Sequence, residues 1–202
     1  MARGALSVRQ AMITTSLAGS LLVAGCSNQS KDRSPDWTRN TEVLARTANL
    51  KPLDAATEKA ALERFEAFYS NYSADVIQEG VRGLYADDAW FGDPFHIVEG
   101  IDEIEHYFLV MAEPVVACAF TVDSIDQSGI DYFARWTMTL ESKAAKGEII
   151  KTIGISHIRF NEEGQVLFQQ DYWDSSAMLD RLPIVGYWTR LVKDRIGKGL
   201  EQ

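Results

Sequence analysis

Residues 84–95 read Leu84-Tyr85-Ala86-Asp87-Asp88-Ala89-Trp90-Phe91-Gly92-Asp93-Pro94-Phe95, and they mark the change from helices to strands along the chain. Before this stretch, apolar residues recur at helical spacing, and Asp87-Asp88 is predicted to end the last of these helices. Within it, Ala89 to Phe91 indicates a short strand, and Asp93-Pro94 is typical of a turn. The stretch therefore separates a helical part of the chain from a part dominated by strands.

Two helices are predicted before this stretch and one after it. Asp54 is placed to cap the first helix, whose apolar positions are Leu62, Phe65, Phe68, Tyr69 and Tyr72. Ser73 is placed to cap the second, whose apolar positions are Val76, Ile77, Val81, Leu84 and Tyr85. The third, over about 100–112, has a face formed by Ile101, Ile104, Phe108 and Met111.

Four long strands are predicted after the helices, over about 115–126, 130–142, 148–160 and 165–174. Turn sequences at 127–129, 145–147 and 161–164 make these strands consecutive hairpins. Helices followed by a meandering sheet indicate an α+β domain over 54–177. A strongly curved antiparallel sheet with N-terminal helices packed on it encloses a pocket between the two layers.

The C-terminal stretch 178–202 is predicted to be an amphipathic helix. Its apolar residues alternate with Arg190, Lys193, Arg195 and Lys198. Such a helix can lie on an anionic membrane or pack on its own domain with a solvated outer face. The pattern favours packing on the domain.

The first 25 residues are typical of an export signal, because Arg3 and Arg9 precede a short apolar stretch over 11–23. The run Leu22-Val23-Ala24-Gly25-Cys26 resembles the lipobox of bacterial lipoproteins, which implies lipidation of Cys26. Residues 26–53 are then a flexible tether. Ser27 after the cysteine implies the outer membrane, so the expected location is the cell envelope, with the domain facing the periplasm and held to the membrane by its lipid.

Composition excludes several classes of protein. The 202 residues carry 20 Lys and Arg against 29 Asp and Glu, a net charge of −9, so nucleic acid is not an expected partner. The two cysteines, Cys26 and Cys118, exclude a disulfide scaffold. The three histidines have no metal-ligand spacing and phosphate-binding glycine loops are absent, so neither a metal nor a cofactor is expected.

The stretch 84–95 closely resembles a segment of ketosteroid isomerases, which belong to the SnoaL-like, nuclear-transport-factor-2-like superfamily. Residues 158–166 and Asp171-Tyr172-Trp173-Asp174 resemble the last two strands of that superfamily. The resemblance covers about 60–177 and implies a cone-shaped α+β fold with a deep pocket. This fold hosts isomerases, hydrolases, cyclases and binding proteins without activity, so it does not specify the reaction.

The isomerase resemblance places Asp93 where these enzymes keep a general base. Trp90, Phe91 and Phe95 could form an apolar wall that raises the pKa of Asp93. Alternatively, Asp93 only caps the backbone of its turn. Tyr69 or Tyr72 corresponds to the tyrosine of the oxyanion hole, and the position of its protonated acid is Ser156.

A second branch, the limonene-epoxide-hydrolase-like enzymes, uses an Asp-Arg-Asp set. Asp171 matches one acid, Arg135 matches the arginine, and Thr137 occupies the second acid position. Alternation puts Arg135 and Thr137 on one sheet face with Trp136 on the other, and Asp171 shares a face with Trp173. The expected arrangement pairs Arg135 with Asp171 in the pocket, and the alternative is an ion pair on the outer face.

These observations predict a pocket for a small, mostly apolar molecule. The predicted catalytic residues are Asp93, Asp171 and Tyr69, and the predicted ligand-binding residues are Trp90, Phe91, Arg135, Thr137, Ser156 and Trp173. Both familiar catalytic sets lack an acid, which favours a binding protein. The alternatives are an isomerase-like or hydrolase-like enzyme with Asp93 or Asp171 as general base, and a module that forms homodimers.

Overall fold

The computed structural model describes residues 35–143, 147–181 and 184–200, and the chain divides into two units, residues 1–38 and 39–202. The described part of the first unit is the beginning of helix α1 (Pro35–Arg46). The predicted signal and Cys26 lie outside the described residues. Within those residues, no helix combines the length and the apolar run that a membrane crossing requires.

The three predicted helices are confirmed as α2 (Ala55–Tyr69), α3 (Ala74–Leu84) and α4 (Ile101–Ala112). The Asp54 carboxylate accepts the backbone N–H groups of Ala56 and Thr57 at 3.0 and 3.2 Å, and Ser73 Oγ accepts that of Val76 at 3.4 Å. These caps satisfy backbone donors that have no partner within the first helical turn. The caps therefore fix where α2 and α3 begin.

Helix α3 ends earlier than the sequence pattern predicts. Its last residue is Leu84, and strand β1 (Tyr85–Gly92) starts immediately, so the predicted end at Asp87-Asp88 is wrong. The Tyr85 N–H still donates to Val81 O, but Tyr85 itself is extended and pairs with Val166. Pairing within the sheet thus overrides the helical spacing of Tyr85.

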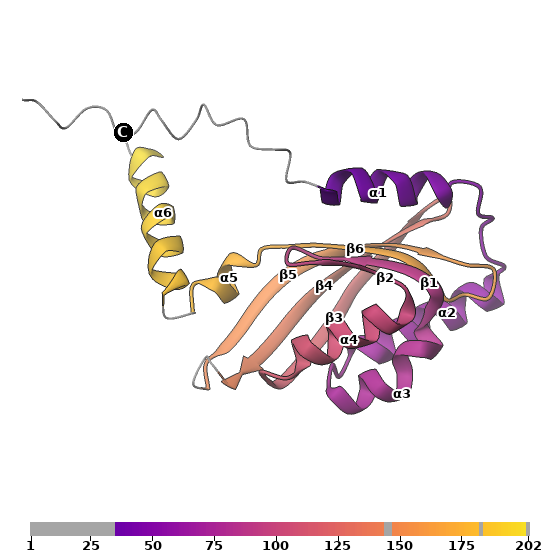
Figure 1. Ribbon diagram of the computed structural model, residues 1–202, viewed down its shortest axis with the longest axis horizontal. Helices are drawn as coiled ribbons and strands as arrows, with labels where there is room; N and C mark the ends of the chain where they lie inside the picture. The colour runs from indigo at the N-terminus through magenta and orange to yellow at the C-terminus, as the bar shows by residue number, and fades with distance from the viewer. Residues whose placement is uncertain (1–34, 144–146, 182–183, 201–202) are drawn as a thin grey trace, which may run out of the picture. The chain divides into compact units, whose positions relative to one another are not determined.

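The sheet has six strands in the order β2-β1-β6-β5-β4-β3. Its strands are β1, β2 (Ile97–Glu99), β3 (Val115–Ser128), β4 (Asp131–Ser142), β5 (Ile149–Phe160) and β6 (Val166–Trp173). Only the β1–β6 pairing is parallel among the described strands. Gly129 and Gly164 turn the chain between β3 and β4 and between β5 and β6 with positive φ angles of 66° and 74°. The four long strands and the α+β class are confirmed, with a curved sheet that does not close (Figure 1).

The two faces of the sheet are covered differently. Helices α2, α3 and α4 lie against one face and form the main core with it (Figure 1). On the other face, Val43 of α1 is buried against Trp90 and Phe168. Arg159 Nη1 donates to Thr47 Oγ1 at 2.7 Å. The segment 26–53, predicted as a flexible tether, therefore contains a helix whose later turns are fixed to the sheet.

The C-terminal stretch forms two helices, α5 (Ser176–Leu179) and α6 (Val185–Leu200). Asp180, between them, accepts Lys193 Nζ at 2.6 Å and the hydroxyl of Thr189. The large apolar side chains of α6 are exposed, among them Trp188 and Ile196. The expected packing of this helix on its own domain is therefore wrong.

Candidate functional site

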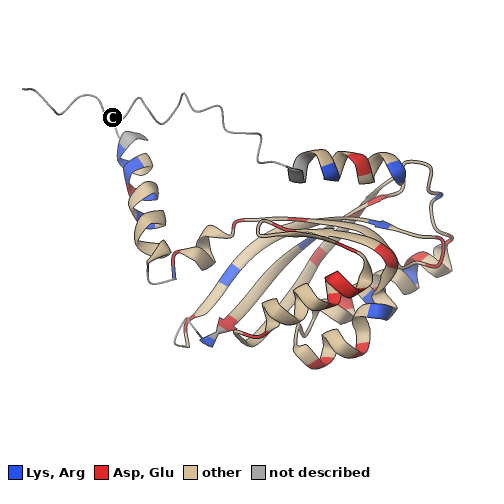
Figure 2. Cartoon of the chain, viewed as in Figure 1, with Lys and Arg blue, Asp and Glu red and all other residues tan. Residues whose placement is uncertain are grey.

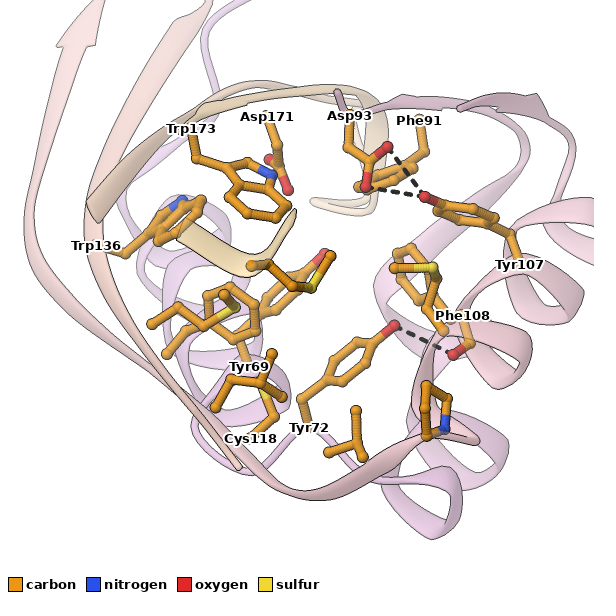
Figure 3. A pocket seen from close by; sticks show the side chains of 17 residues that line it. Tyr69, Tyr72, Phe91, Asp93, Tyr107, Phe108, Cys118, Trp136, Asp171 and Trp173 are labelled. Atoms are coloured by element: carbon orange, nitrogen blue, oxygen red, sulfur yellow. Dashed lines mark hydrogen bonds between the residues drawn. The ribbon is translucent and has the colours of Figure 1, made fainter. Parts of the chain in front are cut away.

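A cavity of about 250 Å³ lies between the sheet and helices α2 and α4 (Figure 3). Its lining is mostly apolar and consists of Phe91, Phe108, Met111, Pro114, Val115, Cys118, Phe120, Trp136, Met138, Leu140, Trp173 and Met178. The polar groups are two carboxyl groups and three phenol hydroxyls, those of Asp93, Asp171, Tyr69, Tyr72 and Tyr107. Both carboxyl groups point into the cavity from the same wall in Figure 3. Such a lining suits an apolar ligand with one polar end.

Asp93 lies in the turn after β1, where its carboxyl group caps the turn and also lines the cavity. Its Oδ1 accepts the backbone N–H groups of Phe95 and His96 at 2.8 and 2.9 Å, as a turn cap does. The hydroxyl of Tyr107 donates to its Oδ1 and Oδ2 at 3.0 and 2.9 Å from within the cavity. Burial raises the pKa of Asp93, and these hydrogen bonds oppose part of that rise because they favour the anion.

Asp171 lies on β6 and is more deeply buried. Its Oδ1 accepts Ser156 Oγ at 2.6 Å and Gln169 Nε2 at 2.9 Å. Burial, with a smaller contribution from the nearby charge of Asp93, raises the pKa of Asp171 to about 7, although the two hydrogen bonds oppose part of this rise. Asp171 is therefore a carboxyl group that exchanges a proton near neutral pH.

A chain of hydrogen bonds behind Asp171 determines which protons remain free. Tyr85 OH donates to Gln169 Oε1 at 2.7 Å, and Gln169 Nε2 donates to Tyr69 OH at 3.1 Å. Because the single proton of Tyr85 goes to Gln169, the contact of 2.6 Å between the two phenol oxygens requires Tyr69 to donate. The hydroxyl proton of Tyr69 is thus donated to Tyr85 and is not available to a ligand.

The other hydroxyl groups around the cavity also donate their protons to groups of the protein. Tyr107 donates to Asp93, and Tyr72 donates to Phe108 O at 3.3 Å. Ser156 donates to Asp171 and accepts Trp136 Nε1 at 2.9 Å. Among the hydroxyl and carboxyl groups of the cavity, a protonated Asp171 is thus the donor available to a ligand.

Three predicted ligand-binding residues lie away from the cavity. Arg135 is exposed, and Thr137 donates to Asp123 at 3.2 Å on the outer face, so the predicted orientation of β4 is wrong. Trp136 takes the inward position, because an apolar ring gains more from burial than an unpaired guanidinium. The predicted pairing of Arg135 with Asp171 is therefore wrong, and with it the Asp-Arg-Asp set. Trp90 is also misplaced, since its ring stacks on Phe168 on the opposite face, 5.0 Å between centroids.

The remaining predicted residues gather at the cavity. Phe91, Trp173, Tyr69 and Asp171 line it, and Ser156 lies behind Asp171. His157 lies on the sheet face opposite Ser156 and contacts Asp131 at 2.6 Å. No group of three or more metal-ligating side chains occurs among the residues that the structure describes.

Three polar residues of the site were not identified from the sequence. Gln169 shares a strand face with Asp171 two positions later, so alternation along β6 could have found it. Tyr85 was assigned to a helix rather than to the sheet. Tyr107 lies beside Phe108 on α4, and nothing in the helical spacing distinguishes its contact with Asp93.

Comparison with known families gives one match, to the model of the SnoaL-like domain, over residues 63–168. No curated protein matches the chain. Solved structures with the same fold include a protein with a ketosteroid isomerase-like fold from Catenulispora acidiphila, in complex with trimethylamine. It has 16% identity and a TM-score of 0.52, and the match covers 61% of this chain and 93% of that one.

Two further structures are similar to the same degree. TsrD from Streptomyces laurentii has 19% identity and a TM-score of 0.52, with 65% of this chain and 98% of that one covered. An epoxide hydrolase of M. tuberculosis that is similar to limonene-epoxide hydrolases has 14% identity and a TM-score of 0.51, with 71% and 96% covered. At these identities the likeness shows the fold alone.

Proposed function

Because this chain belongs to the SnoaL-like domain family, we propose that its cavity binds a small, mostly apolar molecule whose polar end lies at Asp93 and Asp171. The observation that carries this proposal is the contrast between the apolar lining and the two carboxyl groups on one wall. Burial of an apolar ligand supplies affinity at about 25 cal/mol per Å². The carboxyl groups then fix its orientation.

The lipobox-like run that ends at Cys26 supports a location for this binding. We propose that lipidation of Cys26 holds the domain at the cell envelope, on the periplasmic side of the outer membrane. An apolar ligand is concentrated in such a place, because it partitions into the adjacent bilayer.

A substitution that fills the cavity tests the binding function. The measurement is the titration of the protein with the neutral fluorescent probe N-phenyl-1-naphthylamine. Cys118 lines the cavity, so Cys118→Phe occupies space that the probe needs and should weaken its binding by roughly 10-fold or more. The matched control is Ala117→Phe, since Ala117 is exposed on the adjacent position of β3. Equal titration curves for the two variants would contradict binding in this cavity. If the probe does bind in the cavity, native mass spectrometry of the protein purified from its own envelope would identify the natural ligand.

Proton transfer is a second candidate function, favoured by the different surroundings of the two carboxyl groups. Asp93 accepts three donors, which favour its anion, so it can take a proton from a carbon next to a carbonyl group. Asp171, with a pKa of about 7, can give its proton to the carbonyl oxygen as the enol forms. For a ketone with a C=C bond next to that carbon, Asp93 returns its proton to the far carbon of the double bond and the enol oxygen returns its proton to Asp171. The double bond has then moved and both carboxyl groups are restored, which completes an isomerisation.

The same two groups allow a direct measurement of this activity. We expect incorporation of deuterium from D2O next to the carbonyl of an apolar cyclic ketone, and a loss of roughly 100-fold in its rate for Asp93→Asn, because general base catalysis contributes factors of this size. Asp88→Asn, which changes an exposed carboxylate on the preceding strand, should leave the rate unchanged. Equal rates for Asp93→Asn and the unaltered protein would exclude Asp93 as the base.

A further inference from the structure

Helix α6 exposes a row of large apolar side chains. Val185, Tyr187, Trp188, Leu191, Val192 and Ile196 are between 43% and 61% exposed. Trp188, Val192 and Ile196 follow one another at intervals of four residues, so they lie on one face of the helix. A contiguous apolar face of this kind on a soluble domain marks an interaction surface.

The charge of the same helix points to the chemistry of the partner. Helix α6 contains four basic residues, Arg190, Lys193, Arg195 and Lys198, and one acidic residue, Asp194. The whole chain, by contrast, has a net charge of −9. Figure 2 shows these basic residues following one another along α6. Only Lys193 of the four forms an ion pair with a carboxylate among the described residues. The helix is therefore a cationic, amphipathic element of an acidic protein.

The connection of α6 to the rest of the domain leaves this face free. Asp180 receives Lys193 and Thr189, and Arg190 donates to the Asp180 backbone carbonyl, so the contacts hold the first turns of α6 from one side. In an ideal helix, these three contacting positions are centred about 100° around the helix axis from the row formed by Trp188, Val192 and Ile196. The contacts to Asp180 thus lie beside the apolar row and leave the side chains of that row exposed.

We propose that α6 binds an anionic phospholipid surface, with Trp188, Val192 and Ile196 inserted at the level of the headgroups. Arg195 and Lys198 then contact lipid phosphates, and the ring of Trp188 lies in the interfacial layer that tryptophan prefers. An anionic lipid surface complements the charge of α6, whereas pairing with the same helix of a second copy would bring like charges together. This surface is separate from the cavity and needs no ligand in it.

The test places a reporter in the helix of the full-length chain. Cys26→Ser and Cys118→Ser remove the native thiols, and Val192→Cys carries a nitrobenzoxadiazole label on the apolar face. Gly197→Cys is the matched control, since no atom lies within 4 Å of the position of its Cβ and it lies on the other side of the helix. With vesicles of phosphatidylglycerol and phosphatidylcholine we expect a blue-shifted, brighter signal at 192 and an unchanged signal at 197.

The charge requirement is tested in the same labelled chain. Arg195→Gln and Lys198→Gln together should weaken partition onto the anionic vesicles roughly 25-fold, because each basic residue near such a surface contributes about a factor of five. These side chains are exposed, so an unchanged thermal midpoint is expected. An equal response on pure phosphatidylcholine, or equal responses at 192 and 197, would overturn the proposal. So would a response that rises with protein concentration without vesicles, which would assign the face to a second copy.

Discussion

Asp171→Asn should stabilise the protein at pH 8 and change its stability little at pH 4. The pKa of Asp171 is about 7 in the folded state, against 3.8 for an unperturbed aspartate. The folded state therefore binds the proton more tightly than the unfolded state does. Well below pH 3.8 the carboxyl group is protonated in both states, so its ionisation does not affect stability. As the pH rises towards 7, the unfolded state ionises first, so the free energy of unfolding falls.

The magnitude follows from the two pKa values. A difference of one pKa unit is worth about 1.4 kcal/mol, so above pH 7 the buried carboxyl group costs roughly 4 kcal/mol. An asparagine keeps an oxygen for Ser156 and Gln169 and does not ionise. We therefore expect the gap in unfolding free energy between Asp171→Asn and the unaltered protein to widen by roughly this amount from pH 4 to pH 8.

Urea unfolding at a series of pH values measures this gap. The exposed Asp87 provides the control, since Asp87→Asn should give a curve parallel to that of the unaltered protein. In Asp93→Asn, the fall in stability with rising pH should end at a lower pH than in the unaltered protein, because the charge of Asp93 contributes to the raised pKa of Asp171. A gap that stays constant from pH 4 to pH 8 would show that Asp171 ionises as readily in the folded state as in the unfolded chain.

The parts of the fold that were predictable depend on neighbouring residues. Asp54 and Ser73 cap helices through amides two or three residues away, so their roles are encoded locally. Gly129 and Gly164 adopt positive φ angles in tight turns, which fixes where the hairpins lie. By contrast, Tyr85 leaves the helix because it pairs with Val166, about 80 residues later, and no local pattern contains that information.

The site was only partly predictable, because alternation defines two faces of a strand without saying which face is inward. The family resemblance placed Arg135 and Thr137 in the pocket, whereas the apolar set of β4, Ala134, Trp136, Met138 and Leu140, is the buried one. Polarity along β4 was therefore the better guide than the match to a catalytic set. On β6, Asp171 and Trp173 do line the cavity, and their polar neighbour Gln169 follows from the same rule.

Gln169→Leu should destabilise the protein more than any other single change to the network behind the cavity. The amide is fully buried and joins Tyr85, Tyr69 and Asp171 through three hydrogen bonds. Leucine leaves one phenol proton without an acceptor and removes a donor from Asp171. Each buried polar group left without its partner costs about 1–3 kcal/mol, so we expect a loss of roughly 4 kcal/mol in unfolding free energy at pH 5.

The next residue of β6 provides a matched control. Gln170 is half-buried on the other face, and its side chain accepts Asn40 Nδ2 at 3.4 Å and donates to Asp171 O at 3.1 Å. Gln170→Leu should cost about 1 kcal/mol, since water can replace partners at a half-exposed site. Loss of the Gln169 donor should also raise the pKa of Asp171 in the folded state, so the fall in stability of Gln169→Leu should continue to a higher pH than that of the unaltered protein. Equal losses for the two leucine variants would show that the buried amide does not hold the network together.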